Sequence, residues 1–151
     1  MKTSSASGDS FKSNWVTVRD KQSFVFRVRG CYDARIILAS YTKVVDVSSY
    51  EIVISANGNQ VSRIGKDGLD GSNIVEASTP NVLHCTETRY FWVSWGGGYI
   101  QVGSGRVPGE SGFLQLQDST PYKVRSLSFD ADSPTVAIWE FGVDAGLQNT
   151  L

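Results

Sequence analysis

Short runs of alternating apolar and polar residues recur along this chain, and they constrain its fold more than any other feature. In residues 24–29 (FVFRVR), two phenylalanines and Val28 alternate with Val25 and two arginines. Successive side chains of a β-strand point to opposite faces, so this run predicts a strand with aromatic residues on one face and arginines on the other. The same period of two recurs in residues 15–19 and 50–55.

Further strands follow at short intervals, and no segment shows a helical period. They are predicted at residues 35–41, 89–95, 99–103, 113–117, 123–130 and 135–142. Turn clusters separate them: NGN at 57–59, KDGLDGSN at 66–73, GGG at 96–98, VPGESG at 107–112 and ADSP at 131–134. A parallel sheet would need helical crossovers. The pattern therefore predicts an all-β, antiparallel, jelly-roll-like sandwich of about nine or ten strands.

The bulk properties point to one domain. A chain of 151 residues can bury about two thirds of its unfolded surface in a single core. We expect that domain over residues 11–143, with loosely ordered ends at 1–10 and 144–151. The 14 Lys and Arg against 15 Asp and Glu give a net charge of -1, which favours neither nucleic acid nor an anionic membrane as a partner.

The first residues contain no apolar stretch of the kind found in a signal peptide, and no window approaches the roughly 18 apolar residues of a membrane span. A complete chain is therefore expected to be cytoplasmic, whereas a trimmed mature form would be extracellular. Cys31 and Cys85 are compatible with one bridge or with two thiols, and the size of the domain favours reduced thiols. His84 is interpreted as a solvated loop residue, because its neighbours make a poor zinc set.

The glycine-rich segments carry no nucleotide motif. A phosphate loop needs a following helix whose free amides hold the anion, and VPGESG follows the glycines of residues 96–105 instead. KDGLDGSN lacks the spacing of an EF-hand loop, and no G-x-S-x-G element occurs. Paired-carboxylate chemistry is open but unsupported by spacing. No cofactor, metal or catalytic residue is therefore assigned.

The aromatic residues admit two interpretations. In residues 89–95, Phe91 and Val93 fit a core strand without any function. Trp95 and Tyr99 flank the GGG turn, where flat rings at the end of a sheet would suit the apolar face of a sugar. Simple core packing is the alternative for both.

Several runs, in order, carry a resemblance to a known family. They are FVFRVRGCYDARIILAS, YEIVISANGNQVSRI, RYFWVSWGGGYIQVGSG, FLQLQD and VRSLSFDADSPTVAIWEFG. Over roughly residues 12–142 they resemble the domain named after farnesoic acid O-methyltransferase. The matched positions are Cys31, Asp33 and Ala34; Tyr50, Glu51 and Ile52; Gly58, Asn59, Ser62 and Arg63; Phe91, Trp92, Ser94 and Trp95; Val102, Gly103 and Gly105; and Trp139 and Phe141.

The family name implies methyl transfer from S-adenosylmethionine to a terpenoid carboxylate. The residues do not support it, because the usual methyltransferase cofactor site is a strand-to-helix turn in an α/β sheet. The resemblance also implies a module of extracellular multidomain proteins, for which binding is the more natural role.

We therefore expect a non-catalytic, lectin-like, carbohydrate-binding module. Weak single sites would require a homo-oligomer for useful avidity. The candidate ligand-binding residues are Trp95 and Tyr99 for stacking, with Asn57, Asn59, Arg63 and Asp118 for hydroxyl or acidic groups. An arginine such as Arg63 would suit a sugar carboxylate through its bidentate fork. The alternatives are a methyltransferase and a protein-interaction module without a small ligand.

Overall fold

The computed structural model describes residues 2–6, 15–18, 20–40, 48–69, 74–131 and 137–141. The strands in these residues are β1 (Lys2–Ala6), β2 (Trp15–Thr17), β3 (Ser23–Arg29), β4 (Ala34–Ala39), β5 (Ser49–Ser55), β6 (Val61–Lys66), β7 (Ile74–Ser78), β8 (Arg89–Ser94), β9 (Tyr99–Ser104), β10 (Gly112–Gln117), β11 (Ser126–Ala131) and β12 (Ala137–Phe141). Two short helical segments are α1 (Ala56–Asn59) and the 3-10 turn η1 (Gly96–Gly98).

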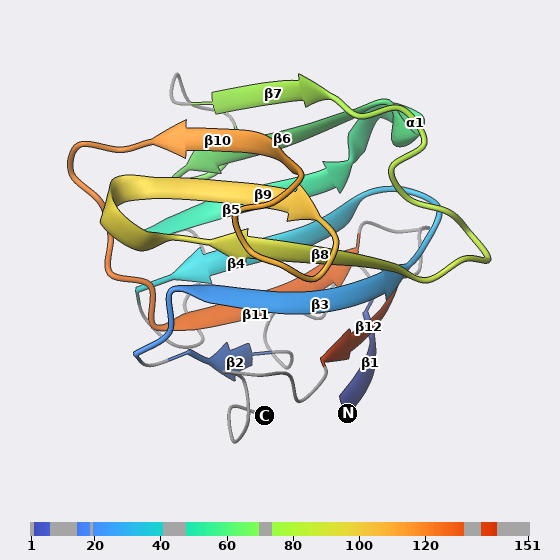
Figure 1. Cartoon of the computed structure of the whole chain (residues 1–151), viewed down its shortest axis with the longest axis horizontal. Coiled ribbons are helices and arrows are strands. Elements are labelled where there is room, and N and C mark those ends of the chain that lie inside the picture. The colour runs from blue at the N-terminus through green and yellow to red at the C-terminus, as the bar shows by residue number, and fades with distance from the viewer. Residues whose placement is uncertain are drawn as a thin grey trace.

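The strands form two six-stranded antiparallel sheets, which lie one behind the other in Figure 1. Sheet A has the order β1-β12-β3-β8-β9-β10, and sheet B has the order β2-β11-β4-β5-β6-β7. The predicted antiparallel β-sandwich is therefore confirmed, with twelve strands among the described residues in place of nine or ten. Among those residues, no helical segment is long and apolar enough to cross a bilayer.

Aromatic side chains from both sheets fill the centre of the sandwich. The ring centroid of Phe26 on β3 lies 5.6 Å from that of Phe129 on β11 and 6.0 Å from that of Phe91 on β8. All three rings are buried, at separations typical of packed aromatic pairs. The alternation in residues 24–29 is thus explained, because the phenylalanines enter the core while Arg27 is directed to the outer side of sheet A.

The aromatic and glycine-rich segment forms the hairpin that its sequence predicts. β8 leads into η1, and β9 returns antiparallel with Val102 opposite Val93. Gly97 and Gly98 have left-handed φ angles of 65° and 83°. A Cβ at Gly98 would also lie 2.5 Å from the carbonyl oxygen of Asp118, so this position requires glycine for both conformation and space.

Trp92 is buried although it alternates with the core residue Phe91 and so lies on the outer side of sheet A. Its partner across the hairpin is Gly103, where any side chain would collide with the indole. The loop at residues 105–111 covers the ring, and the indole Nε1 donates to the carbonyl oxygen of Glu110 at 2.8 Å. This loop curls over β8 in Figure 1. The loop thereby buries Trp92 on the outer face of β8.

Two edge strands differ from the sequence prediction. β1 pairs with β12, whereas the sequence predicts a loosely ordered segment at residues 1–10. β7, for which the sequence predicts no strand, pairs with β6 at the edge of sheet B. β1 and β7 are both edge strands, and backbone hydrogen bonds to a single neighbour leave little pattern in side chains. The predicted tail at 144–151 and parts of the turns at 66–73 and 131–134 lie outside the described residues.

Candidate functional site

The six residues proposed from the sequence do not form one site. The structure places Trp95, Tyr99 and Asp118 beside η1, Asn57 and Asn59 in α1, and Arg63 on β6 of sheet B. The backbone amide of Asp118 donates to the carbonyl oxygen of Gly98 at 2.7 Å, which fixes Asp118 to the β8–β9 turn. That turn and α1 lie at opposite ends of the sandwich in Figure 1. We call the end with the β8–β9 turn the glycine end. We call the end with α1 the disulfide end, because a bond between Cys31 and Cys85 lies there.

Trp95 is a packing residue at the glycine end. Its side chain is only 8% exposed, and its indole Nε1 donates to the carbonyl oxygen of Lys21 at 3.0 Å. Its backbone amide donates to the carbonyl oxygen of Gln22, also at 3.0 Å. The prediction of a stacking surface at Trp95 is therefore wrong, because the segment before β3 covers the ring. Tyr99 is 41% exposed.

Asp118 lies at the centre of a polar network that connects the two sheets. Its carboxylate accepts a hydrogen bond from the hydroxyl of Tyr50 at 2.7 Å and pairs with the ammonium of Lys66 at 2.8 Å. The backbone amide of Thr120 donates to the same carboxylate at 3.0 Å. The side chains of Asp118 and Lys66 are 8% and 13% exposed, so this is a nearly buried ion pair.

Tyr122 and Asp67 extend this network. The hydroxyl of Tyr122 donates to the carboxylate of Asp67 at 2.7 Å, and the ammonium of Lys66 lies 4.6 Å from the centre of the Tyr122 ring. The backbone amide of Tyr122 donates to the hydroxyl of Tyr50 at 3.0 Å. We call these five residues, Tyr50, Lys66, Asp67, Asp118 and Tyr122, the Asp118 latch.

The protonation states in the latch follow from these contacts. Burial alone would raise the pKa of Asp118, but hydrogen bonds from Lys66, Tyr50 and Thr120 outweigh it and lower the pKa to about 2. Burial, together with the hydrogen bond to Asp118, raises the pKa of Tyr50 above its ordinary value. At neutral pH the network therefore holds an ionised Asp118 and a neutral Tyr50. Because its polar groups bond mainly to one another, the latch stabilises the fold and offers little to a ligand.

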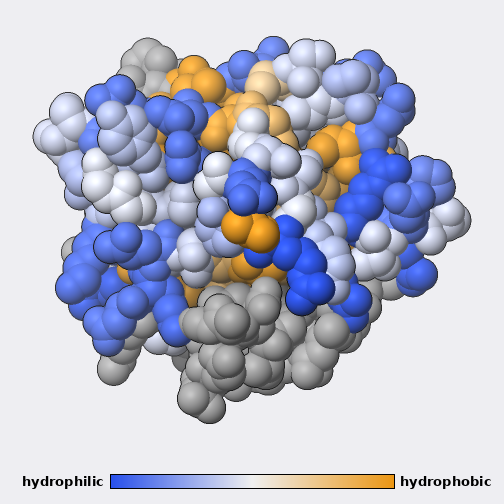
Figure 2. Space-filling model, in the orientation of Figure 1, coloured by the Kyte–Doolittle hydropathy of each residue, from blue (hydrophilic) through white to orange (hydrophobic). Residues whose placement is uncertain are grey.

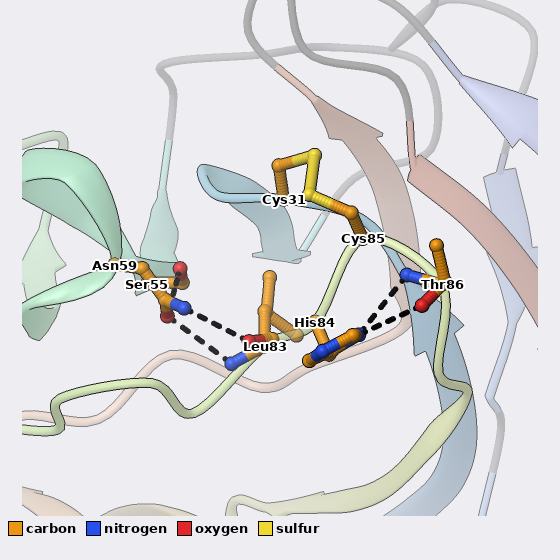
Figure 3. Close-up of a disulfide and its surroundings, with 7 residues drawn as sticks. All are labelled: Cys31, Ser55, Asn59, Leu83, His84, Cys85 and Thr86. Carbon is orange, nitrogen blue, oxygen red and sulfur yellow. Dashed lines mark hydrogen bonds between the residues drawn. A yellow bond between two sulfur atoms is a disulfide. The ribbon is translucent and has the colours of Figure 1, made fainter.

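At the disulfide end, Asn59 ties α1 to the loop at residues 79–88. Its amide nitrogen donates to the carbonyl oxygen of Leu83 at 2.8 Å, and its amide oxygen accepts from the Leu83 backbone nitrogen at 3.1 Å. Figure 3 shows this paired contact beside Ser55, whose hydroxyl donates to the same amide oxygen at 2.6 Å. Asn59 is therefore occupied in structure, whereas Asn57 is exposed at the tip of the turn.

α1 is a left-handed turn, in which Asn57, Gly58 and Asn59 have φ angles of 51°, 68° and 69°. Asparagine and glycine tolerate this conformation better than other residues, which explains why an NGN sequence stands here.

A disulfide closes the same end. Cys31, after β3, is bonded to Cys85 of the 79–88 loop, with Cα atoms 4.2 Å apart (Figure 3). The sequence-based preference for two reduced thiols is wrong, because domain size says nothing about which cysteines the fold brings into contact. His84 is exposed, as predicted, and its Nδ1 accepts from the backbone amide of Thr86 at 3.1 Å.

Arg63 is engaged across the edge of sheet B. It stands opposite Glu76 of β7 in strand register, and its guanidinium forms an ion pair with that carboxylate. Both side chains are partly exposed, so the pair lies at the surface. The structure does not bring Arg63 together with Tyr99 or Asp118.

The disulfide end also contains an open hollow of about 380 Å³. Its lining is Val82, Glu87, Arg89, Tyr90, Phe91, Ser104 and Gly105. Phe91 is buried and Val82 is half-buried, which gives the hollow an apolar portion. Glu87 and Arg89 add a carboxylate and a guanidinium, joined at 3.0 Å, and both side chains are reached by solvent. We call this space the disulfide-end hollow.

Arg89 also holds the loop that borders this hollow. Its Nη1 donates to the carbonyl oxygens of Asn81 and Val82, at 2.6 and 3.2 Å. The 79–88 loop is thus fixed at three places along its length, by Arg89, by the Asn59–Leu83 contact and by the Cys31–Cys85 bond. These three attachments hold one wall of the hollow in place.

Two more arginines surround Tyr90, which lines the hollow. The Nη1 of Arg27 donates to the Tyr90 hydroxyl at 3.2 Å, and its guanidinium carbon lies 5.6 Å from the ring centre. The guanidinium carbon of Arg106, in the 105–111 loop, lies 4.8 Å from the same ring. Both distances are within the range of cation–π contacts.

Sequence reasoning missed this site because its residues come from three separated segments and form no motif. The signals available were an arginine and a tyrosine at the start of β8, Arg27 on the arginine face of β3, and Cys85 close to Glu87. The strand pairing of Arg27 with Tyr90 and of Phe91 with Ser104, together with the disulfide, brings them together.

Metal-binding clusters and shifted pKa values are two further features of the described residues. No group of three or more His, Cys, Asp or Glu side chains in the described ranges could hold a metal ion. The resolved shifts of pKa among those residues belong to the Asp118 latch, where each shifted group is hydrogen-bonded. Among the described residues, none of the resolved pKa shifts falls on a residue that lines the disulfide-end hollow.

Solved structures with the same fold include proteins that act on or bind carbohydrate. A carbohydrate-binding module, CBM66 from Bacillus subtilis, aligns with a TM-score of 0.50 at 11% identity, over 84% of this chain and 78% of that one. A prokaryotic β-1,3-1,4-glucanase (lichenase) derived from a mouse hindgut metagenome also gives a TM-score of 0.50, at 9% identity, over 82% of this chain and 66% of that one. At these identities the likeness establishes the fold alone.

Sequence comparison places the chain in a family. A protein of Haliotis asinina named Uncharacterized protein 5 is 28% identical over 120 residues, which are 80% of this chain and 68% of that protein. Residues 9–144 match the family model Methyltransf_FA, described as farnesoic acid 0-methyl transferase. The match extends over most of the sandwich and confirms the resemblance seen in the sequence. The chain therefore belongs to the Methyltransf_FA family.

Proposed function

We propose that this chain is a non-catalytic carbohydrate-binding module that holds a saccharide in the disulfide-end hollow and acts as a homo-oligomer. The observation that carries the proposal is the hollow itself, which combines an apolar portion with a carboxylate, a guanidinium and the Ser104 hydroxyl. Small-ligand sites have this composition, with a few placed polar groups in a largely apolar cleft. A sugar presents the matching surface, since one side of its ring is apolar and its edge carries hydroxyls.

The fold supports the proposal by analogy. The Bacillus subtilis neighbour is described as a carbohydrate-binding module, and the lichenase is described as a glucanase. Folds host many functions, so this likeness raises the expectation of a glycan ligand and does not replace the argument from the site. The proposal departs from the sequence-based site, since none of the six residues proposed from the sequence lines the hollow.

A methyltransferase is the second candidate, favoured by the description of the family. It would need a cofactor site, which in common methyltransferases lies at the N-terminus of a helix in an α/β sheet. The helical segments of the described residues, α1 and η1, are single turns within a β-sandwich. Calorimetry with S-adenosylmethionine tests this candidate. Cofactor binding at micromolar concentration would favour the methyltransferase over the carbohydrate-binding module.

Homo-oligomerisation is part of the proposal because one shallow hollow binds a saccharide weakly, and several sites presented together raise the avidity. In the view of Figure 2, hydrophobic residues form small patches among hydrophilic ones, which gives no single broad apolar surface on that face. The oligomer would therefore use another face or a polar contact. Light scattering coupled to size-exclusion chromatography measures the mass directly, and a monomer at all concentrations would remove this part of the proposal.

The site is tested with two matched substitutions. Glu87→Gln removes the carboxylate at the hollow, and Glu76→Gln removes an exposed carboxylate that is also paired with an arginine, on β7. We expect Glu87→Gln to weaken saccharide binding at least about tenfold, because a hydrogen bond to a charged group contributes about 1.5–3 kcal/mol. Glu76→Gln should leave binding unchanged.

The readout is a glycan array on the native assembly, followed by calorimetry with the saccharides that bind. Equal affinities for the two variants would place the site elsewhere. No binding to any saccharide by the wild-type protein would overturn the proposed function itself.

A further inference from the structure

The arginines around Tyr90 form a surface that is distinct from the hollow but adjoins it. Arg27 and Arg106 both contact the Tyr90 ring, which ties the two guanidinium groups to one rigid side chain. Tyr90 lines the hollow, and so does Gly105, the residue that precedes Arg106. An anionic group attached to a ligand in the hollow would therefore meet these arginines.

Charged residues of both signs lie near this surface. Arg29 lies two residues after Arg27, on the same face of β3 and exposed, and Arg89 lies at the hollow. Glu87 pairs with Arg89, and Glu110 belongs to the same 105–111 loop as Arg106. Glu140 of β12 stands opposite Arg27 in strand register.

The chemistry of the stacked guanidinium decides what such a surface recognises. A guanidinium that lies against an aromatic ring keeps its N–H groups along its edge, where they form a planar fork. That fork matches two oxygens of a carboxylate or a sulfate, and it gains energy when the contact is bidentate. Holding the group on Tyr90 also reduces the side-chain entropy lost on binding.

We propose that Arg106 and Arg27 bind the anionic group, a carboxylate or a sulfate, of an acidic saccharide whose ring occupies the disulfide-end hollow. The inference rests on the proposed function and narrows it from saccharides in general to acidic ones. Arg106 is the residue to test, because it is exposed on a loop and its removal leaves the strands intact.

The experiment compares wild-type protein with Arg106→Gln, Arg106→Lys and the control Arg125→Gln. Arg125 is also exposed, but its backbone contacts Ala39 and Val18, away from the hollow. Each protein is screened on an array that presents uronate, sialylated and sulfated glycans beside the same cores without the anionic group. Calorimetry then measures the affinities for the matched pairs, and circular dichroism checks the fold.

We expect wild-type protein to prefer the acidic member of a pair. Arg106→Gln should lose about tenfold in affinity for that member while keeping its affinity for the neutral core, as expected for one charge-assisted contact. Arg106→Lys should recover part of the loss, because it restores the charge without the fork, and Arg125→Gln should match wild type. The uronate and sulfate arms show which anion is preferred.

Two other outcomes would contradict the proposed binding of an acidic saccharide. A preference for neutral cores, or an acidic preference that survives Arg106→Gln, would overturn this inference while leaving the carbohydrate-binding function in place. Absence of binding to every glycan would overturn the proposed function and this inference with it.

Discussion

The two ends of the sandwich are closed by different chemistry. At the glycine end, an ionised Asp118 and its partners join the sheets through side chains that bond to one another. At the disulfide end, a covalent bond and the amide of Asn59 hold the 79–88 loop, and most of these contacts use backbone atoms on the loop side.

This difference explains where a ligand can bind. A side-chain network consumes the polar groups that it joins, so the Asp118 latch leaves few of them for a ligand. Fixing a loop through its backbone leaves its side chains at the surface, as with Glu87 at the hollow. The comparison predicts that both ends matter for stability and that one of them matters for binding.

The largest effect is expected from replacing both cysteines by serine. The bond spans a sequence separation of 54, and the loss of this cross-link should lower the free energy of unfolding by about 4 kcal/mol in the chain-entropy model. Saccharide affinity should fall as well, because the loop with Val82 and Glu87 loses its covalent attachment. Urea denaturation and calorimetry measure the two effects. Unchanged affinity in a folded, destabilised variant would contradict the assignment of the site to this end.

Asp118→Asn should destabilise the protein almost as much without affecting binding. The change leaves the nearly buried ammonium of Lys66 without its counter-ion, and breaking such a pair costs about 3 kcal/mol. Glu76→Gln, which breaks a surface pair, should cost less than about 1 kcal/mol. Reduced saccharide affinity in folded Asp118→Asn would mean that the glycine end contributes to the site after all.

The dependence on pH identifies the source of this effect. The pKa of Asp118 is lowered from 3.8 to about 2 on folding, so its stabilising contribution is complete above pH 3.8 and is lost as the pH falls toward 2. The difference in unfolding free energy between wild type and Asp118→Asn should therefore shrink over that window. A constant difference from pH 5 to pH 2 would show that the carboxylate's charge is not responsible.

Much of the fold could be predicted because its signals are local. The alternation in β3 and the glycines of η1 report on their own backbone, and the structure confirms both. The edge strands β1 and β7 could not be predicted in the same way, since backbone pairing with one neighbour requires no side-chain pattern.

The site was harder to predict because burial and proximity depend on distant segments. Alternation correctly directs Trp95 toward the same face as Phe91, but its place beside a turn suggested exposure. The residues that bury it, Lys21 and Gln22, lie more than seventy positions earlier in the chain. The loop that borders the hollow is likewise attached by a bond between Cys31 and Cys85, which are 54 positions apart, and no local pattern encodes that pairing.

The smallest effect is expected from Tyr99→Ala, which compares the site proposed from the sequence with the one proposed from the structure. Tyr99 is exposed at the glycine end, at the start of β9, whereas Ser104 at the other end of that strand lines the hollow. A ligand in the hollow would therefore not reach the Tyr99 ring, and its removal should change saccharide affinity less than about twofold, well below the loss expected for one contact. Calorimetry on Tyr99→Ala and Glu87→Gln with the same saccharide compares the two losses of affinity. A large loss for Tyr99→Ala with none for Glu87→Gln would return the site to the glycine end, where stacking on an exposed phenol would then have to proceed without Trp95.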